Sequence, residues 1–144
     1  MRIPNVKVCL VRESSTAAVA RHVQSPADAA EVLRAHIGDS DREVFAALLL
    51  DTRNRVVGIH TISIGSVNAS IVHPREVFKA AFLANAAAVL VGHNHPSGEE
   101  TPSQEDVAIT HRLRQAGEIL GVPVLDHLVL GAATFHSMKE RGLF

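Results

Sequence analysis

The stretch from residue 88 to residue 96 constrains the fold of this chain more than any other part of the sequence. Residues 88–92 are apolar or small (AVLVG) and run directly into the polar sequence HNHP. A short continuous apolar run that ends at a proline predicts a buried strand followed by a loop. In an extended chain residues i and i+2 point to the same side, so the imidazoles of His93 and His95 can converge where this strand ends.

The remaining sequence predicts an alternation of strands and helices without a strict βαβ rhythm. We expect strands at Val6–Val11, Val44–Leu50, Val56–Ile64, Ala88–Gly92 and Val122–Leu130, with a short one at Thr134–His136. We expect helices from Ser25 to Gly38, from Pro74 to about Ala87 and from about Ser103 to Gly121. The second and third strands, joined by a polar turn at 51–54, are predicted to form a hairpin. This pattern indicates an α/β or α+β domain of three layers with a mixed sheet.

The size and charge of the chain limit what it can be. Its 144 residues suffice for one hydrophobic core. Its net charge of -1 gives no overall positive potential that would attract nucleic acid or an anionic membrane. Cys9 is the only cysteine, so no internal disulfide is expected. No segment approaches the roughly 20 apolar residues of a membrane span. We therefore expect a cytoplasmic protein in which residues 1–40, a strand and a helix, pack as part of the same unit as residues 41–144.

A candidate third metal ligand follows the two histidines. Ser103 and Asp106 stand at the predicted start of a helix, with seven residues between His95 and Ser103, so the Asp106 carboxylate lies in the first turn. S-x-x-D is also an ordinary capping-box variant, and an isolated H-x-H often lies on the surface by chance and binds no metal. The two interpretations are compatible, since a cap would fix the carboxylate. Two imidazoles and one carboxylate suit a single Zn²⁺ ion with its fourth position open to water.

The complete string, His93-x-His95, seven residues, then Ser103-x-x-Asp106, resembles the signature of the JAMM (MPN+, JAB) metalloproteases. The sequence HNHPSG at 93–98 and the later Asp126-His127 are similar to the RadC-type branch of that family. The likeness extends from about Asp41 to Phe144. It implies an MPN/JAB-like mixed sheet flanked by helices, in a cytidine-deaminase-like three-layer arrangement. Full-length RadC proteins usually carry an N-terminal helix-hairpin-helix region, and only about forty residues precede Asp41, so a short form is expected.

The resemblance also implies an activity and roles for particular residues. JAMM enzymes bind Zn²⁺ through the two histidines and the aspartate and cleave peptide or isopeptide bonds, which makes a peptide or a ubiquitin-like protein the expected substrate. Their general base is a glutamate at the start of an early strand, a position that Glu43 matches. Glu76 is the competing candidate, but a carboxylate just inside a helix start is explained by the helix dipole. Ser103 is expected to donate a hydrogen bond to the developing oxyanion.

Three further residues are candidates for supporting the metal ligands. Ser97 belongs to the loop after His95, where the turn chemistry of Pro-Ser-Gly already explains it. Asp126 and His127 fall inside an apolar strand, and a buried polar pair there needs partners. They could support the metal site from behind its ligands or form a satisfied core pair.

Two other functions compete with hydrolysis of a peptide bond. A metal-dependent nuclease or a DNA-repair-associated factor is suggested by the RadC likeness and by two pairs of basic residues, Arg53/Arg55 and Arg112/Arg114. Such enzymes usually need two metals or a basic groove, and the sequence shows one ligand set and a neutral balance. The other alternative is a non-catalytic, zinc-bearing MPN binding module. The sequence does not predict an oligomeric state.

Overall fold

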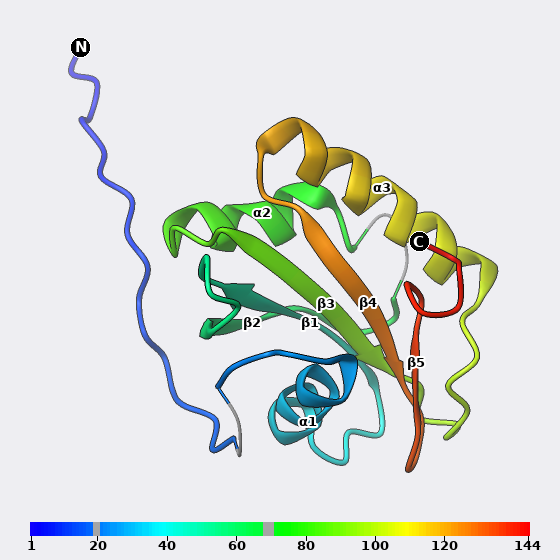
Figure 1. The fold of residues 1–144 in the computed structure, drawn as a ribbon. Helices are drawn as coiled ribbons and strands as arrows, with labels where there is room; N and C mark the ends of the chain where they lie inside the picture. Colours follow the sequence, from blue (N-terminus) through cyan, green and yellow to red (C-terminus); the bar gives the residue numbers. More distant parts are fainter. Residues whose placement is uncertain (19–20, 68–70) are drawn as a thin grey trace.

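A five-stranded mixed sheet forms the centre of the computed structural model, which describes residues 1–18, 21–67 and 71–144 (Figure 1). Its strands are β1 (Glu43–Leu50), β2 (Val56–Gly65), β3 (Ala88–Asn94), β4 (Val124–Leu130) and β5 (Phe135–Ser137). They lie in the order β2-β1-β3-β4-β5. Strand β1 is antiparallel to β2 and β3, β3 is parallel to β4, and β4 is antiparallel to β5. The predicted mixed sheet and the β1–β2 hairpin are confirmed.

Helices cover both faces of this sheet and produce the predicted three layers (Figure 1). Helix α1 (Pro26–Ile37) lies on one face, and α2 (Pro74–Leu83) and α3 (Gln104–Leu120) lie on the other. Successive residues of β1 alternate between the two cores, which explains why its sequence is apolar throughout. Among the described residues, no helix combines the length and the apolar character needed to cross a bilayer.

The helix ends follow the capping signals, with one early termination. Ser25 caps α1 in a capping box with Asp28, and Gly38 ends that helix at φ 65°. Helix α2 ends at Leu83, although we expected it to reach about Ala87. The reason is Asn85, which takes up the left-handed conformation at φ 52°, a region that asparagine tolerates better than most residues.

The strand predicted at Val6–Val11 is wrong. Residues 1–14 are exposed and form no strand, and Figure 1 shows this segment running away from the sheet. A β-branched sequence forms a strand only where a neighbouring edge supplies hydrogen bonds. Residues 21–23 pair instead with residues 54–56, where the chain enters β2. The Val56 N–H donates to Arg21 O at 2.8 Å, and the Val23 N–H donates to Asn54 O at 2.9 Å. Whether residues 1–40 form one unit with 41–144 stays a prediction.

Helix α1 packs tightly against β3 at Gly92, the residue that precedes His93. A Cβ atom built on Gly92 would lie 2.5 Å from Leu33 Cδ1 and 3.2 Å from the backbone oxygen of Leu128. Leu33 is fully buried, so its side chain has little room to withdraw. The absence of a side chain at Gly92 therefore allows α1 to lie directly on the strand that carries the histidines.

Gly92→Ala is expected to lower the free energy of unfolding by about 1–3 kcal/mol, the usual cost of inserting an extra carbon into a filled core. Equilibrium unfolding in denaturant measures this change. In a Leu33→Ala background the new methyl group has space, so the same substitution should cost less there. An equal cost in both backgrounds would contradict the proposed steric cause.

Candidate metal centre

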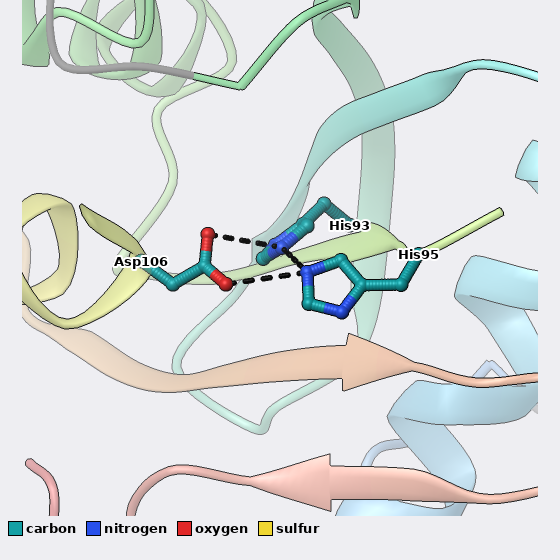
Figure 2. Close-up of side chains that lie close together, drawn as sticks. All are labelled: His93, His95 and Asp106. Carbon is teal, nitrogen blue, oxygen red and sulfur yellow. Dashed lines mark hydrogen bonds and ion pairs between the residues drawn. The ribbon is translucent and has the colours of Figure 1, made fainter. Parts of the chain in front are cut away.

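Strand β3 delivers two histidines to the sheet face that carries α3 (Figure 2). His93 lies within the strand and is fully buried, and its ring stacks on Phe45 of the neighbouring strand at a centroid distance of 5.8 Å. The N–H of His95 donates to Leu130 O at 2.9 Å, which continues the pairing with β4 one residue beyond the end of β3. The chain therefore remains extended through His95, and the two imidazoles converge as predicted.

Asp106 reaches the same point from the first turn of α3. Ser103 is the N-cap residue of this helix: its Oγ accepts a hydrogen bond from the Asp106 N–H at 3.0 Å. In return, the Asp106 carboxylate accepts one from the Ser103 N–H at 2.8 Å. This reciprocal pair is a capping box, so the ordinary interpretation of S-x-x-D is correct. The cap also holds the carboxylate toward the histidines.

The potential ligand atoms of the three residues lie close enough to share one ion (Figure 2). His93 Nε2 is 3.1 Å from His95 Nε2 and 3.3 Å from Asp106 Oδ1, and His95 Nε2 is 3.2 Å from Asp106 Oδ2. Tetrahedral ligands with bonds of about 2.0–2.1 Å to zinc stand about 3.3 Å apart. The cluster of His93, His95 and Asp106 can therefore hold a metal ion.

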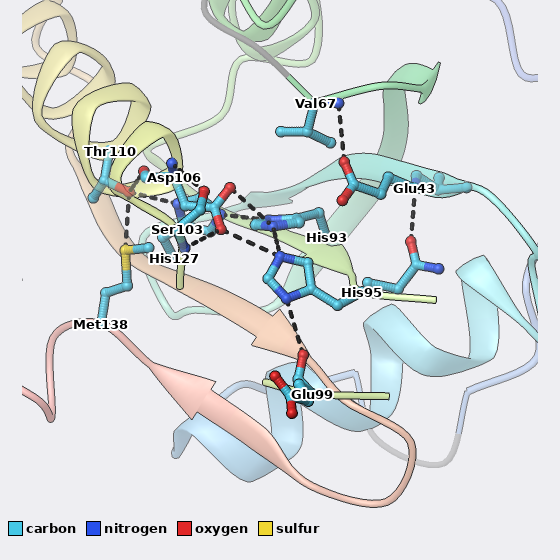
Figure 3. A network of polar contacts seen from close by, with 12 residues as sticks. Glu43, Val67, His93, His95, Glu99, Ser103, Asp106, Thr110, His127 and Met138 are labelled. Atoms are coloured by element: carbon cyan, nitrogen blue, oxygen red, sulfur yellow. Dashed lines mark hydrogen bonds and ion pairs between the residues drawn. The ribbon is translucent and has the colours of Figure 1, made fainter. Parts of the chain in front are cut away.

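The hydrogen bond of His95 Nδ1, the ring nitrogen that points away from the cluster, shows that Nε2 faces the cluster with a lone pair. His95 Nδ1 lies 2.9 Å from the backbone oxygen of Glu99, which can only accept, so Nδ1 carries the hydrogen (Figure 3). In the neutral ring, Nε2 is then an acceptor that faces an acidic oxygen of Asp106. Two acceptors at this separation repel each other unless a cation or a proton lies between them, which supports a metal-binding role.

The electrostatics of the site keep its acidic ligand charged. Burial alone would raise the pKa of Asp106, but the neighbouring His93 ring and the hydrogen bonds of Ser103 hold this pKa well below its usual range. A metal ligand has to be deprotonated, and Asp106 meets this condition at neutral pH. Burial lowers the pKa of His127 well below its ordinary value, so this ring is neutral.

Glu43 borders the cluster, as expected for the predicted base. It is the first residue of β1, and its Oε2 accepts a hydrogen bond from the Val67 N–H at 3.0 Å (Figure 3). It shares a surface groove with two of the cluster residues; the groove is lined by Glu43, Val67, His95, Pro96, Ser97, Ser103, Glu105 and Asp106. Glu76 is not one of these residues; it lies on α2 and pairs with Lys79 at 3.0 Å. The geometry thus favours Glu43, whose catalytic role stays a prediction.

Asn94, which the sequence analysis did not identify, links Glu43 to the histidine pair. Its Oδ1 accepts a hydrogen bond from the Val44 N–H at 2.7 Å, and its Nδ2 donates to Arg42 O at 3.0 Å. These two contacts lie on either side of Glu43 in the sequence. One amide side chain between the two histidines therefore fixes the start of β1 relative to the end of β3.

The three supporting candidates have different surroundings. Ser97 lines the groove, and its Oγ accepts a long hydrogen bond, 3.5 Å, from the Glu99 N–H. Asp126 binds the C-terminal turn instead, because its carboxylate accepts hydrogen bonds from Ser137 Oγ and from the Lys139 N–H. Adjacent residues of a strand point to opposite faces, so His127 points the other way and reaches His93 Nδ1 at 2.8 Å.

Thr110 is a second residue that the sequence analysis missed. Its Oγ1 contacts His127 Nδ1, and it also donates to the backbone oxygen of Asp106 at 2.8 Å (Figure 3). A signal for it existed: Thr110 stands four residues after Asp106, and residues i and i+4 share a helix face. A polar residue at that position on a buried face needs a partner.

Comparison with known proteins gives consistent results. The family model described as the RadC-like JAB domain matches residues 23–143. A UPF0758 protein of Shouchella clausii is 52% identical over 122 residues, which are 85% of this chain and 53% of that protein. UPF0758 proteins of Moorella thermoacetica and Rubrobacter xylanophilus are each 50% identical over 121 residues, 84% of this chain and 53% of theirs. The chain thus spans about half the length of the curated relatives it matches.

Proposed function

This chain belongs to the RadC-like JAB domain family, and from that premise we propose that it is a zinc-dependent hydrolase that cleaves a peptide or isopeptide bond. The observation that carries the proposal is the convergence of His93, His95 and Asp106 within ligand distance of one another. Two nitrogen donors and one carboxylate suit zinc better than magnesium or calcium, which prefer oxygen ligands.

The three residues would hold the ion on one side and leave its remaining position open to the groove. A zinc ion bound there would lower the pKa of a water molecule toward neutrality and would polarise a substrate carbonyl. The protein contributes geometry: the capping box fixes Asp106, and the backbone oxygen of Glu99 fixes the ring of His95. These supports reduce the reorganisation that ligand binding would otherwise require.

Glu43 is the proposed general base. Its carboxylate would take the proton of the attacking water and then deliver it to the nitrogen of the scissile bond, so that an amine and a carboxylate leave. Such proton transfers typically contribute about 10²- to 10⁴-fold to a rate. The Val67 N–H occupies Glu43 Oε2, which orients the carboxylate beside the cluster.

Ser103 is the proposed oxyanion donor. Its Oγ already accepts the hydrogen bond of the Asp106 N–H, so the lone hydroxyl hydrogen is free to point elsewhere. The residue is exposed and lines the groove. A hydroxyl donor in this position can stabilise negative charge on the carbonyl oxygen of the substrate, a contribution of about 3 kcal/mol in comparable sites.

The charge of the groove favours a protein substrate over nucleic acid. Three of its lining residues are carboxylates: Glu43, Glu105 and Asp106. None of the lining residues, all from the described part of the chain, is Lys or Arg. A phosphate backbone is normally bound by several such cations. We therefore expect a peptide or ubiquitin-like protein as the substrate.

Metal removal tests the proposal. The purified protein should bind about one zinc ion per chain and should cleave members of a panel of peptides and isopeptide-linked ubiquitin-like probes. A strong chelator should abolish cleavage, and equimolar zinc should restore it, because the ion supplies the electrophile. Zinc content is measured by elemental analysis and cleavage by mass spectrometry. A zinc-loaded protein that cuts none of these probes would indicate a binding module, and one that cuts DNA would indicate a nuclease.

A further inference from the structure

A buried chain of polar side chains connects His93 back to Asp106 through two other elements (Figure 3). His93 Nδ1 lies 2.8 Å from His127 Nε2, across the parallel pair β3–β4. His127 Nδ1 lies 2.5 Å from Thr110 Oγ1 on α3, and Thr110 Oγ1 lies 2.8 Å from the backbone oxygen of Asp106. His93, His127 and Thr110 are all fully buried, so water does not replace any member of this chain.

The direction of the Thr110 hydroxyl, the last side chain in this series of contacts, sets the position of the hydrogens on His127 and His93. Thr110 Oγ1 also lies 3.0 Å from Met138 Sδ, and neither that thioether sulfur nor the backbone oxygen of Asp106 can donate. A threonine hydroxyl has one hydrogen, and the carbonyl four residues earlier in a helix commonly accepts it. With its hydrogen on either of those acceptors, Thr110 Oγ1 accepts from His127, so His127 Nδ1 carries the hydrogen. The neutral His127 ring then has a lone pair on Nε2 and accepts from His93 Nδ1. As a result, His93 Nε2 is left with its lone pair directed at His95 and Asp106.

We propose that Thr110 and His127 are positioning residues that hold His93 in the tautomer with hydrogen on Nδ1, ready to bind a metal through Nε2. This inference rests on the proposed function only in requiring that the cluster bind a metal. His95 needs no such device, because its Nδ1 faces a backbone oxygen that cannot donate. The partner of His93 is another imidazole, which can donate or accept, so the direction of the whole chain depends on Thr110.

The test compares two substitutions of nearly equal size at Thr110. Thr110→Ser keeps the hydroxyl and loses a methyl group, whereas Thr110→Val keeps the shape and loses the hydroxyl. Loss of an outer partner of a metal-binding histidine typically costs about 10- to 100-fold in metal affinity. We expect a loss of this size for Thr110→Val and a loss of less than about threefold for Thr110→Ser, measured by competition with a chromophoric zinc chelator.

A second measurement reads the tautomer directly in the metal-free protein. Long-range ¹H–¹⁵N spectra distinguish a histidine with hydrogen on Nδ1 from one with hydrogen on Nε2. The wild type and Thr110→Ser should show His93 protonated at Nδ1. In Thr110→Val the Nδ1 hydrogen of His127 would lack an acceptor, so we expect both rings to change to hydrogen on Nε2. If the valine variant does not fold, Thr110→Ala makes the same comparison.

Ser137→Ala is the matched control, since it removes a different buried hydrogen bond of β4, the one from Ser137 to Asp126. It should lower the melting temperature and leave zinc affinity unchanged. The inference would be overturned if the valine and serine variants bound zinc with equal affinity. It would also be overturned if His93 carried its hydrogen on Nε2 in the wild type. Absence of hydrolysis alone would count against the proposed function and not against the positioning role, because neither measurement depends on turnover.

Discussion

Glu43→Gln should reduce hydrolysis by about 10²- to 10⁴-fold while the protein continues to bind about one zinc ion per chain. The amide oxygen of glutamine can still accept the hydrogen bond of the Val67 N–H, so the local structure is preserved. What is lost is a group that can take a proton from water near neutral pH. The measurements are kcat on a cleaved probe and zinc content by elemental analysis of the same sample.

Glu76→Gln is the control for this substitution. Glu76 is the other glutamate that the sequence suggested as a base, but it lies on α2 in an ion pair with Lys79. An exposed pair of this kind contributes little to stability, so both fold and activity should be retained. Full activity in Glu43→Gln, or loss of activity in Glu76→Gln alone, would contradict the assignment of the base.

His95→Ala should remove both the metal and the activity. It deletes one of the three proposed ligands, so zinc affinity should fall further than the roughly 10- to 100-fold expected for loss of an outer partner. The side chain of His95 is 15% exposed and that of His93 is fully buried, so the change at His95 should disturb packing less. Competition titration with a chelator measures the affinity, and circular dichroism checks the fold.

His111→Ala serves as the matched control, because it removes an exposed histidine from α3 and leaves the cluster intact. It should bind zinc and hydrolyse the probe like the wild type. Retention of wild-type zinc affinity in His95→Ala would show that the ion binds elsewhere, and the proposed centre would then be wrong.

Local sequence rules predicted most of the fold and the convergence of the three candidate metal ligands. The convergence of His93 and His95 follows from strand alternation alone, and the position of Asp106 follows from a capping signal that begins at Ser103. These are short-range relations, which a sequence displays directly. The prediction failed at Val6–Val11, where a strand-like composition found no neighbouring edge, and this information lies outside the segment itself.

The supports behind the ligands were only partly predictable because they depend on contacts between distant segments. Asp126 and His127 were proposed together, yet strand alternation separates them, so that only His127 faces the cluster. Thr110 contacts His127 because α3 packs across β4, a relation between segments that are distant in the sequence. Asn94 lies in the same motif as the histidines, but its role depends on the register between β1 and β3, which no local pattern specifies.

The double use of Asp106 has a thermodynamic consequence. The same carboxylate begins α3 and is a proposed metal ligand, so ion binding and the fraying of the first helical turn would be linked. An ion that binds only the ordered turn stabilises it by about 2.7 kcal/mol at one hundred times its dissociation constant. Removal of the metal should therefore first loosen residues 103–106, which form one wall of the groove. The protein would then lose substrate recognition together with its ion, while the distant sheet remains folded.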